Sequence, residues 1–284
     1  MIDEFSHLNG KKILVTGSNG FIGRNLIKKL KELNLDFTEF KGDILEGISE
    51  KEDYDLIFHL AAKVPQNTSD EEDYAKVNVE GVKLVLEFCK EKNSKIIYTS
   101  TIGVHGDVKE VVTENSIISP NLTPYASSKF KGEDICKEYS KKYGVNCCIL
   151  RFSTVYGFGQ EGGYLIPTLI RALKEDKVAK LRDKNAFRDY IHVEDVIDTL
   201  LSSTKIDNSI INVAYEKTYS VGEIVELVRK ISGKNLKVEY SKLEDQEIKG
   251  FKIDISLSKK LLKWDPKINI EEGIKRILIQ EHLL

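Results

Sequence analysis

The chain has 284 residues, of which 41% are hydrophobic and 31% are charged, and its formal net charge at pH 7 is −2. This composition excludes a disordered chain and predicts a globular protein with one large domain or two modest ones. The small charge offers no bulk attraction to nucleic acid or to an anionic membrane, and no apolar run approaches the roughly 20 residues that span a bilayer.

The four cysteines have neither C-x-x-C spacing nor the pattern of a disulfide framework. Cys147 and Cys148 are adjacent in an apolar run, where free cysteines pack as small hydrophobes. The five histidines lack metal-ligand spacing, so we expect no metal site. The polar N-terminus has no apolar leader segment. We therefore expect a cytoplasmic protein with reduced thiols.

Strands and helices alternate in the first half of the chain. Residues 11–16 are a β-rich apolar run that stops at Gly17, and apolar residues recur at helical spacing from Phe21. Further strands are expected at residues 36–40, 55–60, 95–100 and 146–151, and helices at 73–92 and from Pro124 onwards. Such βαβ alternation predicts an α/β fold with a doubly wound parallel sheet.

Three glycines occupy the first strand-to-helix turn, in residues 16–23 (TGSNGFIG). Gly17 permits a tight turn, Gly20 lets the backbone approach a pyrophosphate, and Gly23 lets the helix pack closely on the strand. The spacing is G-x-x-G-x-x-G, and an ordinary structural turn is the alternative. Its position between a strand and a helix predicts a dinucleotide site, whose other contacts in this turn are Asn19, Phe21 and Ile22.

The second predicted strand bears on the choice of cofactor. Glu39 at its end could hold a ribose 2′-hydroxyl, which favours NAD, whereas Lys41 could attract a 2′-phosphate, which leaves NADP possible. Asp43, followed by Ile44, is a candidate contact for the adenine.

Residues 124–129 (PYASSK) place Tyr125 and Lys129 four positions apart, and on a helix both would project from the same face. A hydroxyl at the end of strand 95–100, opposite this pair, could pass a proton to or from a substrate alcohol. The charge of Lys129 would lower the pKa of Tyr125 towards working pH. The alternative is an amphipathic helix with an exposed lysine and a half-buried tyrosine.

After Gly157 the alternation loosens. Residues 157–163 are glycine-rich and predict a loop; we then expect helices at 166–174, at 220–232 with Ser220 as N-cap, and from Ile270, and strands at 189–193 and 210–213. This part is expected to form a smaller lobe over the carboxyl edge of the sheet, where ligands bind in open α/β folds. We expect an NAD(P)-binding domain of residues 1–156 and 187–213 and a substrate-binding lobe of residues 157–186 and 214–284.

Taken in order, these motifs resemble the NAD-dependent epimerase/dehydratase family, the extended branch of the short-chain dehydrogenase/reductases, and most of all its nucleotide-sugar epimerases. The similarity spans nearly the whole chain. It rests on residues 17–23, 42–43, 59–62 (HLAA), 78–81 (NVEG), 98–101, Tyr125 with Lys129, 150–152 (LRF), 188–193 (RDYIHV), 212–213 and 264–266 (WDP). The resemblance implies a Rossmann-like sheet.

The resemblance also implies roles for single residues. Tyr125 is expected to be the catalytic base and acid, Lys129 to hold the nicotinamide ribose, and Thr101 to hydrogen-bond the sugar hydroxyl. Arg188 matches an arginine that grips the substrate phosphates, with a salt bridge to an aspartate, Asp189 or Asp195, as the alternative. Further expected cofactor contacts are Leu60, Ala61, Ala62, Lys63, Asn78 and Thr99.

The chain departs from the family pattern at several places, and one of them is His105, which replaces the tyrosine of a usual Val-Tyr-Gly. Residues 102–103 (IG) replace an Asp-Glu pair of the dehydratases, so elimination of water is not expected. Thr154 stands where an asparagine contacts the nucleotide sugar. Glu244 stands where a second phosphate-binding arginine is expected, and Lys242 or Lys249 could substitute for it as point charges.

Three functions follow as hypotheses. The first is a nucleotide-sugar epimerase, acting at C4 through bound NAD. The second is an NAD(P)H-dependent reductase of a nucleotide-linked 4-keto sugar, and the third is a non-catalytic dinucleotide-binding sensor or scaffold, which the complete Thr101, Tyr125 and Lys129 set disfavours. The resemblance further implies a homodimer that pairs through the helices at 73–92 and 124 onwards, and residues 84–88 (LVLEF) could serve that interface or the core.

Overall fold

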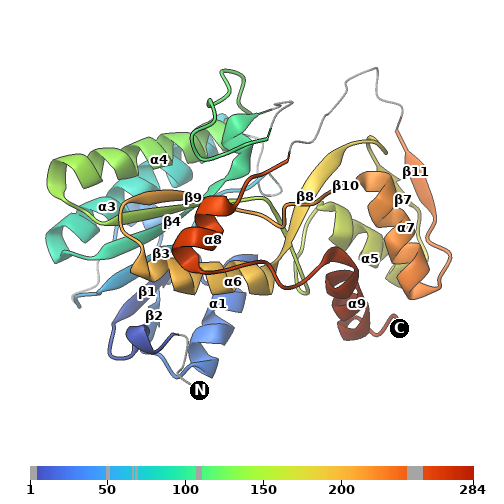
Figure 1. Ribbon diagram of the computed structural model, residues 1–284, viewed down its shortest axis with the longest axis horizontal. Coiled ribbons are helices and arrows are strands. Elements are labelled where there is room, and N and C mark those ends of the chain that lie inside the picture. Colours follow the sequence, from blue (N-terminus) through green and yellow to red (C-terminus); the bar gives the residue numbers. More distant parts are fainter. Residues whose placement is uncertain (1–4, 49–51, 66, 68–69, 107–110, 242–251) are drawn as a thin grey trace.

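The computed structural model describes residues 5–48, 52–65, 67, 70–106, 111–241 and 252–284. Its main body is a six-stranded parallel sheet with the strand order β2-β1-β3-β4-β5-β9 (Figure 1). The strands are β1 Ile13–Thr16, β2 Phe37–Glu39, β3 Leu56–His59, β4 Lys95–Thr101, β5 Cys147–Phe152 and β9 Ser209–Val213. The predicted doubly wound α/β fold is confirmed.

Helices cover both faces of this sheet (Figure 1). Successive strand residues point to opposite faces. Ile13 and Val15 therefore join the core that contains α1 and α6, whereas Leu14 joins the core that contains α3 and α4. Because both faces are covered, β1 is an uninterrupted buried apolar run. The four helices are α1 Phe21–Glu32, α3 Gly81–Lys92, α4 Pro124–Tyr143 and α6 Val193–Ser202.

The helix expected at residues 73–92 is divided into three parts. α2 (Glu71–Tyr74) leads into a π-helical segment, Ala75–Glu80, which continues as α3. Such segments often lie at functional sites, and this one contains the buried Asn78. Val85 and Phe88 of α3 belong to the core, so these two side chains serve packing within the chain.

The second half of the chain forms a smaller lobe with its own apolar core, seen on the right of Figure 1. The strand expected at residues 189–193 is β8, which ends at His192, and the sequence-based prediction missed α6 immediately after it. β8 pairs with β6 and β10 rather than with the six-stranded sheet. The remaining elements are β6 Thr154–Tyr156, α5 Leu165–Glu175, β7 Ala179–Leu181, β8 Phe187–His192, β10 Thr218–Ser220, α7 Val221–Ser232, β11 Val238–Tyr240, α8 Ser256–Leu262 and α9 Ile270–Gln280.

Short 3-10 turns connect several elements, at Ser6–Leu8, Ile44–Glu46, Ile102–His105 and Ser203–Lys205. The N-cap predicted for α7 is confirmed: Ser220 accepts the Glu223 N–H while the Glu223 carboxylate accepts the Ser220 N–H.

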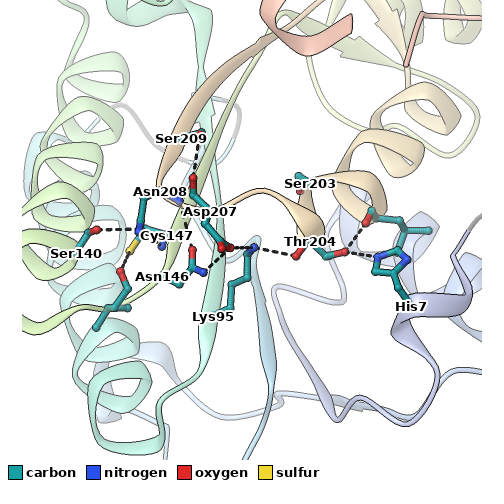
Figure 2. Close-up of polar contacts among 12 residues, drawn as sticks. His7, Lys95, Ser140, Asn146, Cys147, Ser203, Thr204, Asp207, Asn208 and Ser209 are labelled. Carbon is teal, nitrogen blue, oxygen red and sulfur yellow. Dashed lines mark hydrogen bonds and ion pairs between the residues drawn. The ribbon is translucent and has the colours of Figure 1, made fainter. Parts of the chain in front are cut away.

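A polar network ties the amino edge of the sheet together (Figure 2). Lys95, at the start of β4, donates to the Asp207 carboxylate at 2.7 Å and to the Thr204 carbonyl oxygen at 2.8 Å. Asn146, just before β5, also donates to Asp207, and the Asn208 side chain accepts the Cys147 N–H. The loops that precede β5 and β9 are therefore fixed to β4.

Within the described ranges, no helix has the length and apolar character needed to cross a membrane. In the same part of the chain, no group of histidine, cysteine, aspartate and glutamate side chains is arranged to hold a metal ion.

Candidate functional site

A cleft of about 810 Å³ lies where the carboxyl edge of the sheet faces the smaller lobe. It brings together residues from six separate stretches of the chain that the sequence singled out. Among its lining residues are the predicted Gly17, Gly20, Phe21, Ile22, Gly23, Leu60, Ala62, Thr99, Thr101, Tyr125, Lys129, Thr154 and Arg188. The three predicted catalytic side chains therefore share one cavity with the glycine turn.

The glycine turn has no room for side chains at two positions. Gly17 has a φ of +69°, and a Cβ there would lie 2.5 Å from the Ala61 nitrogen. A Cβ on Gly23 would lie 2.2 Å from the Gly17 carbonyl oxygen. The glycines therefore let α1 pack closely on the ends of β1 and β3, as predicted.

The N-terminus of α1 is free to bind an anion. Gly20 is its N-cap, and no side chain caps the helix. The first N–H groups of a helix have no partner within the helix and carry a partial positive charge. Gly20, Phe21 and Ile22 line the cleft at this point. The turn thus fits the pyrophosphate of a dinucleotide.

The start of α4 is set by its sequence. Thr123 Oγ1 accepts the Ala126 N–H at 3.2 Å, and Pro124 occupies the first turn. This cap places Tyr125 in the first turn of the helix, at the cleft. The Tyr125 hydroxyl makes no hydrogen bond to any other residue that the structure describes.

The predicted lowering of the Tyr125 pKa is wrong for the protein chain itself. Burial raises the pKa of Tyr125, and the neighbouring Tyr164 and Tyr74 add to the increase. The Tyr74 and Tyr125 ring centroids are 6.0 Å apart. Removing the phenolate from water and placing it among aromatic rings disfavours the charged form of Tyr125.

Lys129 is only 3% exposed. In the described part of the chain no carboxylate lies within ion-pair distance of its ammonium group. Burial lowers the pKa of Lys129 to about 8, although Cys136 and Glu133 oppose this change. Its position in the second turn of α4 directs it to the same cleft as Tyr125.

Thr101 ends β4, and its Oγ1 accepts the Gly103 N–H at 3.1 Å. The hydroxyl thereby caps the following 3-10 turn, Ile102–His105, and its own proton stays available to a ligand in the cleft. Sequence reasoning placed this hydroxyl opposite Tyr125, and both side chains do line the cleft.

A buried ion pair anchors α4 to the sheet behind these side chains. Arg151 of β5 donates to both carboxylate oxygens of Glu133, from Nε at 2.9 Å and from Nη2 at 2.6 Å. Ser100 Oγ also donates to Glu133. Arg151 Nη1 lies 3.1 Å from His105 Nε2, which must accept because a guanidinium only donates. This network joins α4, β4, β5 and the turn after Thr101.

Arg188 is available to a ligand. Its guanidinium donates to the Phe187 carbonyl oxygen at 2.7 Å and forms no ion pair within the described ranges. Asp189 instead accepts hydrogen bonds from Ser153 and from two backbone N–H groups. Asp195 accepts two backbone N–H groups. The alternative of a structural salt bridge to either aspartate is therefore absent here.

Several predicted cofactor residues do not line the cleft. The Asn78 amide bonds both backbone atoms of Lys63, at 2.8 and 3.0 Å, and Ser128 Oγ at 2.9 Å, so it ties the loop after β3 to α4. The side chain of Asp43 caps the turn that contains Ile44. The complete set that does not line the cleft is Asn19, Glu39, Lys41, Asp43, Ile44, Ala61, Lys63 and Asn78. Their contacts with a cofactor stay predictions.

Sequence reasoning missed other cleft residues. Arg24 donates to the Asn19 carbonyl oxygen at 2.7 Å and to the Gly159 carbonyl oxygen at 2.9 Å, and so connects the glycine turn with the 157–163 loop. Its place directly after Gly23 could have revealed it. Tyr164 and Phe187 also line the cleft, and no spacing pattern identifies them. Glu244, Lys242 and Lys249 lie outside the described residues.

The chain is similar to known proteins over most of its length. The profile of the NAD dependent epimerase/dehydratase family matches residues 13–214. An uncharacterised UDP-glucose epimerase of Bacillus subtilis is 30% identical over 93% of this chain and 95% of its own, and the UDP-glucuronate 4-epimerase of Thermodesulfobacterium geofontis is 31% identical over 89% and 80%. The UDP-glucuronic acid 4-epimerase of Bacillus cereus, solved with UDP-glucuronic acid and NAD, has a TM-score of 0.86 at 28% identity and covers 95% of this chain and 99% of that one. The chain belongs to the NAD-dependent epimerase/dehydratase family.

Proposed function

We propose that the protein is an NAD-dependent nucleotide-sugar 4-epimerase. The observation that carries the proposal is the shared cleft. Thr101, Tyr125 and Lys129 line it together with the glycine turn, after which no side chain caps the N-terminus of α1. Relatives that match nearly the whole chain are UDP-glucose and UDP-glucuronate epimerases.

The cofactor would be held by two parts of the cleft. The free N–H groups of the glycine turn would bind its pyrophosphate, and the Lys129 ammonium would hold the hydroxyls of the nicotinamide ribose. When bound, NAD supplies the hydride acceptor and donor for the sugar carbon. The acidic Glu39 at the end of β2 supports NAD over NADP.

Tyr125 would remove the proton of the sugar 4-hydroxyl and later return it. Because burial raises the pKa of Tyr125, the neutral hydroxyl is the resting form. Ionisation then requires positive charge close to the ring, and Lys129 supplies it while protonated, below about pH 8. Thr101 would donate a hydrogen bond to the same sugar oxygen and fix its direction.

The substrate phosphates would lie on Arg188, whose planar guanidinium can make two parallel hydrogen bonds to phosphate oxygens. The turn that follows Thr101 begins with Ile102 and Gly103, and neither carries an acid or a base. Elimination of water from the keto sugar has no proton donor or acceptor there, which supports epimerisation over dehydration.

The test is an assay of purified protein with UDP-glucose and UDP-glucuronic acid, after mass spectrometry of the nucleotide that it retains. We expect retained NAD, inversion at C4, and no net change at the nicotinamide absorbance band. Stoichiometric consumption of NADPH with a keto sugar would replace this proposal by the reductase. Binding of a dinucleotide with no turnover of any nucleotide sugar would favour the non-catalytic sensor.

We further propose a homodimer located in the cytoplasm. Four buried free cysteines support a reducing compartment. The resemblance to family members that pair through their α3 and α4 equivalents supports the dimer. Analytical ultracentrifugation of the purified protein would contradict the dimer if it found monomer alone at micromolar concentration.

A further inference from the structure

Tyr98 has contacts that neither its strand nor core packing requires. It is a fully buried residue of β4, and its hydroxyl donates to the Lys129 carbonyl oxygen at 3.3 Å. The Lys129 ammonium lies over the Tyr98 ring, 4.4 Å from its centroid. One aromatic side chain thus contacts both the backbone and the charged end of Lys129.

We infer that Tyr98 is a positioning residue for the proposed reaction, because its ring is the support that holds the Lys129 ammonium in the cleft. A cation at this distance from an aromatic face is attracted by the ring quadrupole, and the attraction is strongest where water is excluded. Lys129 has no carboxylate within ion-pair distance among the residues described, and the Tyr98 ring is in direct contact with its ammonium group.

Helix α4 has a glycine at the point where it meets the Tyr98 hydroxyl. Gly132 lies inside α4, where glycine is normally unfavourable. A Cβ at this position would lie 2.2 Å from the Tyr98 hydroxyl oxygen. The missing side chain therefore makes the space in which the hydroxyl reaches the backbone of Lys129, one helical turn earlier.

A second ring packs against Tyr98 from the neighbouring strand. The His59 ring of β3 stacks on Tyr98 with a centroid distance of 6.0 Å and an angle of 17° between the planes. His59 Nδ1 lies 2.8 Å from Thr16 Oγ1. Burial and the charge of Lys129 lower the pKa of His59 to about 3, so the stacked ring is neutral at physiological pH and does not repel the ammonium above it.

The titratable groups that face Lys129 come from three elements. They are Tyr125, Glu133 and Cys136 of α4, Tyr98 of β4 and His59 of β3. The Glu133 carboxylate is occupied by Arg151, and the pKa of Tyr98 is raised well above its usual value by burial. The Tyr98 ring therefore acts on Lys129 as a neutral aromatic face.

The experiment measures the pKa of Lys129 by NMR of lysine labelled with carbon-13, with the signal assigned through Lys129→Arg. Position 98 carries a graded series: Tyr98→Phe, followed by phenylalanine analogues with increasing numbers of ring fluorines. Fluorine weakens the ring quadrupole with little change of shape. We expect Tyr98→Phe to stay close to the natural protein, and the most fluorinated ring to lower the Lys129 pKa by about one unit.

Tyr98→Met removes the ring, and Tyr139→Leu is its control, because Tyr139 is a buried tyrosine of the same core that bonds Glu87 instead. We expect Tyr98→Met to lower the Lys129 pKa and Tyr139→Leu to leave it unchanged. In an active enzyme the alkaline limb of the kcat profile should move with the Lys129 pKa. A constant pKa across the fluorinated series would overturn the inference.

This inference rests on the proposed function, but the two can fail separately. The NMR titration needs no substrate, so it tests the support of Lys129 even if no nucleotide sugar is turned over. Conversely, an active epimerase with an unchanged Lys129 pKa in every variant would leave the proposed function intact and refute the role of Tyr98.

Discussion

The positively charged side chains at the two edges of the central sheet differ in whether they have a carboxylate partner. At the amino edge, Lys95 is bound to a carboxylate and a carbonyl oxygen (Figure 2). At the carboxyl edge, Lys129 and Arg188 have no carboxylate partner in the described part of the chain. Burying the Lys129 charge without a carboxylate is costly, whereas Arg188 is exposed to solvent, and both cations are accessible to a ligand in the cleft. The charge at the amino edge stabilises the fold, and we propose that the charges at the carboxyl edge bind phosphate and ribose.

The largest effect on activity is expected at Tyr125 in the cleft, because its hydroxyl forms no hydrogen bond with any other described residue. Tyr125→Phe should lower turnover by about 10³-fold, which is the usual contribution of a general acid and base. Because no hydrogen bond is lost, the midpoint of thermal unfolding and the amount of retained NAD should not change. Steady-state kinetics measures the loss of turnover, and a thermal melt measures the midpoint of unfolding. Turnover at the original rate would refute the catalytic role.

Substitution of Arg188 tests whether this cation of the cleft, which has no ion-pair partner among the described residues, binds the substrate phosphates. Arg188→Met should raise the KM for the nucleotide sugar by about 10- to 100-fold, since it removes charge-assisted bonds to phosphate. Arg182→Met is the matched control, because Arg182 is exposed and outside the cleft. Equal KM values for the two variants would contradict phosphate binding by Arg188.

His59, at the end of β3, is expected to make the free energy of unfolding depend on pH. Burial lowers its pKa to about 3, whereas an unfolded histidine titrates near about 6.5. The unfolded chain therefore binds more protons between these values, and the stability that neutral His59 contributes is lost as the pH falls through this window. The slope is at most about 1.4 kcal/mol per pH unit.

Urea denaturation of the natural protein and of His59→Gln at about pH 7 and about pH 5 checks this expectation. The variant should lose less stability on acidification. His282→Gln, at an exposed position, should behave as the natural protein does. Parallel pH profiles for His59→Gln and the natural protein would show that His59 is not the group responsible.

The smallest effect is expected at the amino edge. Lys95→Met should lower the free energy of unfolding by about 1 kcal/mol, because the Thr204 carbonyl oxygen loses the Lys95 donor, while Asp207 keeps the Asn146 donor and stays exposed to water. Turnover should be unchanged. A fall in turnover that exceeds the loss of folded protein would mean that the two edges are coupled.

The sequence was sufficient to predict the features that depend on local pattern. The six strands, the glycine turn, the cap of α7 and the start of α4 follow from apolar period, glycine spacing and capping residues. The shared position of Thr101, Tyr125 and Lys129 in one cleft follows from strand and helix ends.

Features that depend on distant partners could not be predicted. The availability of Arg188 follows from Ser153 and the backbone of residues 215–217, which occupy Asp189 instead. The raised pKa of Tyr125 follows from its burial, to which Tyr164 and Tyr74 from other parts of the chain add. Such contacts form only when the chain folds, so no spacing rule reveals them.

In the proposed reaction, one bound NAD removes and returns the same hydrogen at C4 of a nucleotide sugar. UDP-glucose with deuterium at C4 tests this directly when it is incubated with the purified protein without added cofactor and followed by NMR. We predict a C4 epimer that retains the deuterium at C4. Loss of the deuterium to solvent, or formation of product only when NADPH is added, would contradict the account.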